Sequence, residues 1–290
     1  MHRSVPIPTL ALAFLSACLG DPRGHLDRAR ELAFQRQPAE ALREYEEVLS
    51  LVAKKDPQRV RALLVPALKG AGDLCYLELK QPQRAVEFYK SLNHHFPDAK
   101  EALEAHANLA DLFRSLGDRR AAVAELTASV QGFQDGPDLD LYQYQATKDY
   151  FDLKDYDQVQ LEARFLQSRW PKSEYAVEAQ MLVAAALSLQ GLKERSIEAY
   201  EQIGRGWPQS DLAPRARFEE AKVWSELGKE ERAVEVLVEA LKTHPDPRGV
   251  KAEIARLRKR LATRRARGAT DRAVVWPEFY GGVPPEPSGL

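Results

Sequence analysis

The side chains that most often carry out catalysis are not arranged for it in this chain of 290 residues. His94, His95 and His106 come closest to a metal site, yet two adjacent residues of a helix point in different directions. The sequence has no glycine-rich phosphate loop, no His-Glu-x-x-His motif and no nucleophile elbow. Paired carboxylates such as Glu46-Glu47 fit the polar face of a helix. We therefore predict no enzymatic activity, with no catalytic residue, metal, cofactor or small-molecule substrate.

The chain has two cysteines, Cys18 and Cys75, in very different surroundings. A single possible pair excludes a disulfide framework. Cys75 follows Leu74 and precedes Tyr76, and this setting predicts a buried thiol. Cys18 ends a segment with a basic residue near its start, a mostly apolar stretch at residues 4–15, and then small residues. That stretch has the size of a signal-peptide apolar region and is too short to cross a bilayer.

The sequence Leu15-Ser16-Ala17-Cys18 resembles the lipobox of bacterial lipoproteins. The resemblance implies cleavage of a signal peptide at residues 1–17 and acylation of Cys18, palmitate included, with residues 18–23 as the tether. Two or more buried acyl chains anchor a protein stably. Leu19, rather than Asp, follows the cysteine. By the same resemblance this favours the periplasmic face of the outer membrane over the inner membrane or the cell surface. An ordinary signal peptide cut after Ala17 is the alternative.

The charge is small overall and uneven along the chain. The formal net charge is −1, whereas general nucleic-acid-binding proteins carry a strong positive excess, so we predict no nucleic-acid partner. Segment 248–267 holds nine Lys or Arg residues and one acid, Glu253. The rest of the chain is therefore acidic. A basic end on an acidic body suits an acidic partner or anionic lipid headgroups.

A small residue, or a modest substitute for one, recurs every 37 residues after one longer first step. In most units a bulky residue follows four positions later, and in most a proline that ends the helix follows eleven or twelve positions later. A second small residue lies twelve positions upstream, beyond a turn that often contains glycine. Small residues at two fixed points let paired helices approach closely. Such a period indicates stacked helical hairpins. The recurring positions are Ala41, Ala85, Ala122, Val159, Ser196 and Ala233.

This arrangement resembles the tetratricopeptide repeat (TPR), a helix–turn–helix unit of about 34 residues. The resemblance covers residues 24–245 as about six units and implies an all-α superhelical solenoid. The first interval is longer than the others, and we expect an added helical stretch from Asp56 to Val65 before Pro66. Asp73, flanked by two glycines, replaces the usual small residue of the second unit.

The positions Val250, Ile254, Leu257 and Leu261 fall on one face of a helix. We predict a basic capping helix at residues 246–267 whose apolar stripe covers the last repeat. Residues 268–290 are rich in Pro and Gly, and we predict a flexible tail whose aromatic residues pack on the protein's own body. The outer charges of the helix form the predicted basic surface: Arg256, Arg258, Lys259, Arg260, Arg264 and Arg265.

In TPR arrays the first helix of each unit lines a concave groove, and its inward positions carry over onto this sequence by resemblance. Aromatic side chains beside mixed charges suit an extended or helical peptide. The Lys/Asn clamp that holds terminal carboxylates in eukaryotic chaperone adaptors is not reproduced. The alternative is that some of these side chains pack between units. The predicted groove residues are Asp111, Arg114, Tyr144, Lys148, Phe151, Met181, Phe218 and Lys222.

The layout of a lipobox followed by repeats resembles the TPR lipoproteins of β-barrel assembly, secretin or pilus assembly and cell-wall enzyme coordination. It implies a lipid-anchored interaction scaffold, or adaptor, that assists assembly of an outer-membrane or envelope complex in bacteria. The implied partner is an envelope protein or peptide segment. The alternative is a cell-wall (peptidoglycan) binding protein or a regulator of cell-wall hydrolases.

Overall fold

The computed structural model describes residues 20–275, with side chains described through residue 266. Within this range the regular structure is all helical, with thirteen α-helices, one 3₁₀ helix and one π-helical turn. None of the described helices is both long and apolar enough to cross a bilayer. The chain divides into two compact units between Leu153 and Lys154. This boundary lies in the predicted turn of the fourth repeat, and the division was not predicted from the sequence.

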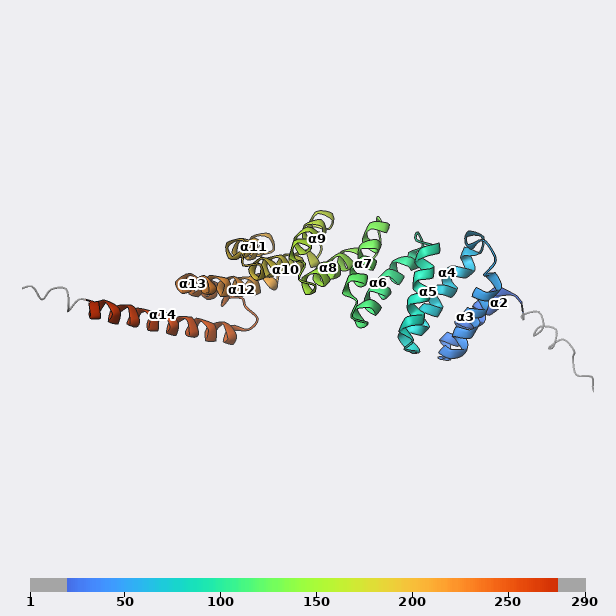
Figure 1. Cartoon of the computed structure of the whole chain (residues 1–290), viewed down its shortest axis with the longest axis horizontal. Helices are drawn as coiled ribbons and strands as arrows, with labels where there is room; N and C mark the ends of the chain where they lie inside the picture. Colours follow the sequence, from blue (N-terminus) through green and yellow to red (C-terminus); the bar gives the residue numbers. More distant parts are fainter. Residues whose placement is uncertain (1–19, 276–290) are drawn as a thin grey trace, which may run out of the picture. The chain divides into compact units, whose positions relative to one another are not determined.

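The first unit holds three helical hairpins and the first helix of a fourth (Figure 1). Helices that follow one another in the chain pack side by side, and most of the buried apolar residues form one continuous cluster. The elements are α2 (Pro22–Phe34), α3 (Pro38–Val52), η1 (Pro57–Val60), α4 (Arg61–Asp73), η2 (Leu74–Glu78), α5 (Pro82–His95), α6 (Lys100–Ser115), α7 (Arg119–Gly132) and α8 (Leu139–Asp152).

The second unit begins with the second helix of the fourth repeat, continues through two hairpins and ends with a single long helix. Ser173 and Ser210 lie just before two of its helices. Their hydroxyls accept hydrogen bonds from the amides of Tyr175 and Leu212, at 3.1 and 3.2 Å, where two first helices begin. The elements are α9 (Tyr156–Arg169), α10 (Tyr175–Leu189), α11 (Lys193–Gly206), α12 (Leu212–Glu226), α13 (Glu230–Ala240) and α14 (Pro247–Val275).

The six recurring residues predicted from the sequence occupy equivalent positions in the six hairpins. Each is the fourth residue of the second helix of its hairpin and is fully buried, Val159 and Ser196 included. The small residues twelve positions upstream, such as Ala184, are buried as well. In the fifth hairpin the two positions touch, because the Ser196 hydroxyl donates to the carbonyl oxygen of Ala184 at 2.8 Å. The recurring residues therefore mark the points at which the two helices of a hairpin approach each other most closely. The predicted TPR-like solenoid fold is confirmed.

The turn inside each hairpin uses one backbone conformation. Three turns place a glycine in the left-handed region: Gly117, Gly191 and Gly228 have φ angles of 82°, 80° and 74°. The equivalent residues of the other three turns take the same conformation with φ angles of 55–62° although they carry side chains. The left-handed region costs a non-glycine residue about 1–2 kcal/mol. The three strained positions are Arg36, Lys80 and Lys154.

The long first interval contains the added helical stretch that the sequence predicted. The Asp56 carboxylate accepts a hydrogen bond from the amide of Gln58 at 2.9 Å and caps η1. Helix α4 then begins at Arg61 and continues through Pro66 to Asp73. Pro66 therefore lies inside the helix and does not mark its end, since a proline in the second turn interrupts one hydrogen bond without stopping the helix.

Asp73, in the place of a small residue, belongs to a partly buried polar cluster around the buried Tyr89. The Tyr89 hydroxyl donates to Asp73 Oδ1 at 2.7 Å and accepts from Asn108 Nδ2 at 3.0 Å. Burial raises the pKa of Tyr89, so its proton stays available for donation. Lys69 Nζ lies 2.7 Å from the Asp73 carboxylate. Gly72 makes room for the ring, because a Cβ there would lie 2.6 Å from Tyr89 Cε1.

Helix α14 covers the last hairpin as predicted. Val250, Ile254 and Leu257 are buried in one cluster with Ala233 and Leu237. The helix continues past residue 267 as far as Val275, the last described residue, so the predicted boundary between the capping helix and the tail was placed too early. The Pro and Gly content of the predicted tail was averaged over its whole length, whereas no proline occurs in it before residue 277 to stop the helix.

Candidate partner-binding surfaces

Arg114 and Asp149 join the first helices of two neighbouring hairpins in the first unit. Arg114 Nε, on α6, donates to Asp149 Oδ2 on α8 at 2.8 Å, and its Nη1 donates to Asp111 Oδ1 at 2.5 Å. Asp149 is 2% exposed and also accepts from Arg119 at 3.0 Å. The predicted groove residues Asp111 and Arg114 are therefore adjacent. Arg114, however, is engaged in packing between hairpins, which is the alternative that the sequence left open.

Helix α8 carries three predicted groove residues at spacings of one helical turn. Tyr144 and Phe151 are half-buried, and Lys148 is exposed. The Lys148 ammonium lies 3.5 Å from the carboxylate of Asp152, a distance at which an exposed pair contributes little. Two aromatic rings flanking an accessible cation in the helix register can contact an apolar and an acidic side chain of a peptide.

The second unit carries the other three predicted groove residues. Met181, on α10, is half-buried against the apolar cluster of that unit. Phe218 and Lys222 lie together on α12, where the Lys222 ammonium is 4.8 Å from the centre of the Phe218 ring. Lys222 also bonds to Glu219 at 2.8 Å, and the His244 ring lies 5.4 Å from Phe218. Each unit thus has its own set, and contact of either set with a partner stays a prediction.

The predicted basic surface is partly neutralised by a buried carboxylate at the start of α13. Glu230 is 1% exposed. Its two oxygens accept from Arg260 at 3.1 Å and from Arg264 at 2.8 Å, and Arg264 also donates to the carbonyl oxygen of Gly228. These two arginines therefore fasten α14 to the last hairpin, a role that the sequence did not predict.

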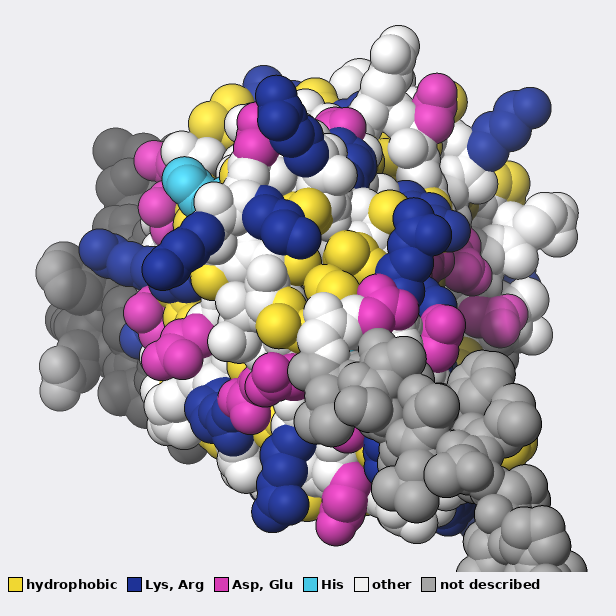
Figure 2. Space-filling model, turned by 90° about the vertical axis from the view of Figure 1, so that its right-hand side faces the viewer, with side chains coloured by type: hydrophobic (Ala, Val, Ile, Leu, Met, Phe, Trp, Pro, Cys, Tyr) yellow, Lys and Arg dark blue, Asp and Glu magenta, His cyan; other side chains and the backbone are white. Residues whose placement is uncertain are grey.

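The remaining charges of that surface fall into two groups. Arg256 and Arg265 have ion-pair partners at 2.5 and 3.5 Å among nearby acids. Arg258 and Lys259 are exposed and make no ion pair with the described side chains. Figure 2 shows the side of the first unit at which α2 and α3 lie, and there acidic and basic side chains are interspersed around apolar ones. Of the six predicted charges, only Arg258 and Lys259 thus lack an ion-pair partner among the described side chains, and all six are exposed.

Asp149 is the residue that a closer comparison of the repeats would have found. It stands ten positions before the recurring residue of its repeat. From the second repeat on, the equivalent positions are otherwise apolar and buried. An acid in a core position indicates a buried ion pair, because an isolated buried charge is strongly disfavoured. The equivalent residues of the second, third, fifth and sixth repeats are Cys75, Leu112, Ala186 and Val223.

Two histidines make the same contact in two hairpins. His106 Nδ1 lies 2.7 Å from Glu125 Oε2, and His25 Nδ1 lies 2.6 Å from Glu44 Oε2. The four residues hold equivalent places in the first and third repeats. The described side chains form no group of three or more potential metal ligands. His106 is therefore part of the packing between paired helices.

Several predicted features lie outside the described residues. Cys18, the signal peptide at residues 1–17 and the first two residues of the tether at 18–23 are among them, as are the tail aromatics Trp276, Phe279 and Tyr280. Cys75 lies inside the range and is fully buried, as predicted. Burial raises the pKa of its thiol and keeps it protonated.

Comparison with known proteins supports the fold independently. Residues 72–99 match the family described as Tetratricopeptide repeat. No curated protein matches the sequence. The C-terminal part of a TPR repeat-containing protein from Cytophaga hutchinsonii is 11% identical, with a TM-score of 0.58 over 84% of this chain and 91% of that one. A chain in the structure of Naa15/Naa10 bound to HypK-THB is 14% identical, with a TM-score of 0.53 over 88% of this chain and 36% of that one.

The class of protein follows from these observations. Residues 72–99 are similar to a tetratricopeptide repeat, and the described helices form a TPR-like array of hairpins. This is a scaffold fold that typically binds other proteins and is typically not catalytic. The fold does not by itself identify the partner.

Proposed function

We propose that this protein is a lipid-anchored adaptor of the bacterial cell envelope that binds an envelope protein or peptide segment and assists assembly of an envelope complex. The observation that carries the proposal is the arrangement of three side chains on α8. There Lys148 is accessible between half-buried Tyr144 and Phe151 on a first helix of the array. Rigid hairpins hold these side chains in place before a partner arrives, which lowers the entropic cost of binding.

The proposed anchor is Cys18, at the end of the lipobox-like sequence. Acyl chains on this residue would hold the protein at the periplasmic face of the outer membrane. Tethering raises the effective concentration of the adaptor for partners in the same membrane, so that weak contacts suffice for capture.

The groove assignment is tested by replacing Tyr144, Lys148 and Phe151 with Ala. Partners are first identified by cross-linking in native envelopes and mass spectrometry, and their capture by the variant is then measured. We expect capture to fall at least tenfold while the circular dichroism spectrum stays unchanged. The matched control is Leu161→Ala, which removes an exposed apolar side chain from the second helix α9. Unchanged capture by the triple variant refutes the groove assignment.

The anchor is tested separately with Cys18→Ser in the full-length chain. We expect the variant to move from the membrane fraction to the soluble periplasmic fraction and to lose incorporation of a palmitate analogue. Membrane retention together with continued labelling contradicts lipidation at Cys18, and it leaves the groove test unaffected.

A further inference from the structure

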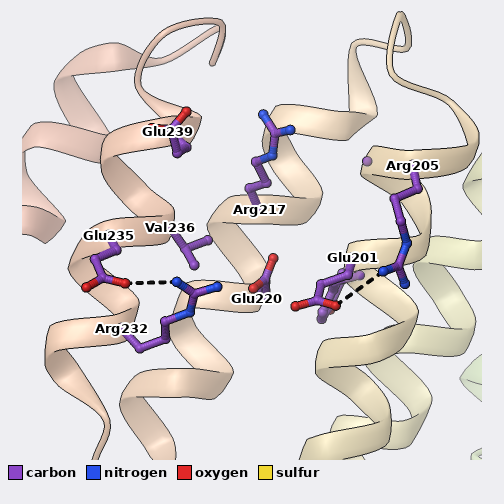
Figure 3. Close-up of a pocket in the computed structure, with 10 residues that line it drawn as sticks. Glu201, Arg205, Arg217, Glu220, Arg232, Glu235, Val236 and Glu239 are labelled. Carbon is purple, nitrogen blue, oxygen red and sulfur yellow. Dashed lines mark hydrogen bonds and ion pairs between the residues drawn. The ribbon is translucent and has the colours of Figure 1, made fainter.

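A charged pocket of about 570 Å³ lies in the second unit, on the side of α12 that faces α11 and α13 (Figure 3). Arg217 and Glu220, one turn apart on α12, point into it between the two neighbouring helices. The predicted groove residues Phe218 and Lys222 lie on the other side of α12, since residues at these spacings are on different helix faces. The pocket is therefore distinct from the predicted groove. It is lined by Tyr200, Glu201, Gly204, Arg205, Arg217, Glu220, Arg232, Glu235, Val236 and Glu239.

The preceding repeat has a pocket of about 310 Å³ at equivalent positions, lined from α9, α10 and α11. Its central polar residue is Gln180, which holds the place of Arg217. Gln180 accepts from Gln167 at 2.9 Å and donates to Gln202 at 3.1 Å and to the carbonyl oxygen of Ala199 at 3.4 Å. This pocket therefore satisfies its central side chain from within the protein.

The charged pocket replaces each member of that amide network. Arg217 stands for Gln180, Gly204 for Gln167 and Glu239 for Gln202. Within the described part of the chain Arg217 makes no hydrogen bond and no ion pair. Gly204 offers the guanidinium no side-chain partner, and a Cβ there would be in van der Waals contact with Arg217 Nη2, at 3.8 Å. The substitutions thus remove the hydrogen-bond partners of the central polar side chain and enlarge the space around it, while Glu220 and Glu239 remain its electrostatic neighbours.

Glu220 is the second unusual residue, since the equivalent residue of the preceding pocket is Val183. It is 5% exposed, and one of its oxygens accepts from Trp224 Nε1 at 3.0 Å. Figure 3 shows its carboxylate between the Arg232 guanidinium and the Glu201 carboxylate. Those two neighbours have partners of their own, in Glu235 at 2.8 Å and in Arg205 at 3.8 Å.

We propose that this pocket is a second docking site, for a partner segment that presents a carboxylate side chain to Arg217 and a cationic side chain to Glu220. Arg217 forms charge-assisted hydrogen bonds with the carboxylate, and the cation lies between Glu220 and Glu201, whose like charges it separates. The volume suits a few side chains of a peptide and not a folded domain. The site is independent of the groove on α8 and exists whether or not that groove binds.

The probe is a helical peptide with three Glu-Ala-Ala-Ala-Lys repeats and blocked termini, titrated against the full chain by fluorescence anisotropy. Two matched peptides carry Gln in place of every Glu or of every Lys. We expect the mixed-charge peptide to bind the wild type at least tenfold more tightly than either matched peptide, and to bind more weakly at high salt. Arg217→Gln is expected to weaken only peptides that contain Glu, and Glu220→Gln only peptides that contain Lys.

The decisive variant is the pair Gly204→Gln and Arg217→Gln, which copies the amide contact of the preceding pocket. It removes a helix-interior glycine, so it is expected to unfold at or above the denaturant concentration of the wild type while binding falls at least tenfold. Arg195→Gln, which removes one positive charge from the preceding pocket, is expected to leave binding unchanged. Equal binding by the double variant and the wild type overturns the proposal, as does the absence of binding to the wild type at millimolar peptide.

Discussion

Asp149→Asn tests whether the buried ion pair between hairpins holds the first unit together. The carboxylate accepts from Arg114 at 2.8 Å and from Arg119 at 3.0 Å while almost fully buried. A hydrogen bond to a charged group contributes about 1.5–3 kcal/mol. The Arg119 side chain is 41% exposed, so its share is reduced by solvent screening. Asn keeps the shape and one acceptor oxygen, and we expect a loss of about 2–3 kcal/mol of unfolding free energy, mostly through Arg114.

The measurement is urea unfolding followed by circular dichroism, with the slope compared between wild type and variant. Asp111→Asn is the matched control, because Asp111 also pairs with Arg114 but is exposed. We expect the control to change the unfolding free energy by less than about 0.5 kcal/mol. The reasoning fails if both variants lose the same amount, or if Asp149→Asn changes stability no more than the control does.

Three further changes test other features of the structure. Arg36→Gly is expected to raise the unfolding free energy by about 0.5–1 kcal/mol over Arg36→Ala, because glycine accepts the left-handed turn; equal urea midpoints would contradict this. Tyr89→Phe removes the hydroxyl between Asp73 and Asn108 and should cost about 1–2 kcal/mol in the same assay, whereas no change would make the cluster dispensable. Burial raises the pKa of Glu220, so its ionised form is unfavourable in the folded state. The resulting loss of unfolding free energy is absent at low pH, where the carboxyl is protonated in both states, and it grows as pH rises through the folded pKa. Glu220→Gln should therefore raise the urea midpoint at about pH 7 and not at about pH 4, and a gain of the same size at both would refute the burial argument.

The repeats could be predicted because they depend on residues that every hairpin needs. A recurring small residue such as Ala122 and a turn glycine such as Gly117 follow from the packing of two helices, so they reappear at a fixed period. Glycine does not mark the turns at Arg36 and Lys154, although the repeat period places the turn at Lys154. Their left-handed backbones are imposed by the flanking helices and leave no glycine in the sequence.

The features that distinguish one hairpin from another were not predicted. Asp149, Glu230 and the Arg217 pocket each depend on which side chain meets which across neighbouring helices, and a periodic pattern does not record that. These residues stand out once the structure identifies which positions of neighbouring repeats are equivalent, as with Gln180 and Arg217. The groove residues could be predicted only in part. Their helices and registers could be placed from the sequence, but the use of Arg114 in packing could not.

The way α14 is fastened to α13 has a consequence for assembly. A stack of identical-looking hairpins has an apolar end that another molecule's first hairpin could continue, giving open-ended chains of molecules. Here that end is covered by Val250 and Leu257, and the helix that covers it is held by two arginines on Glu230. The last helix therefore acts as a terminator of growth. It covers the apolar end of the last hairpin, so that this end is not open to stacking by the first hairpin of another molecule.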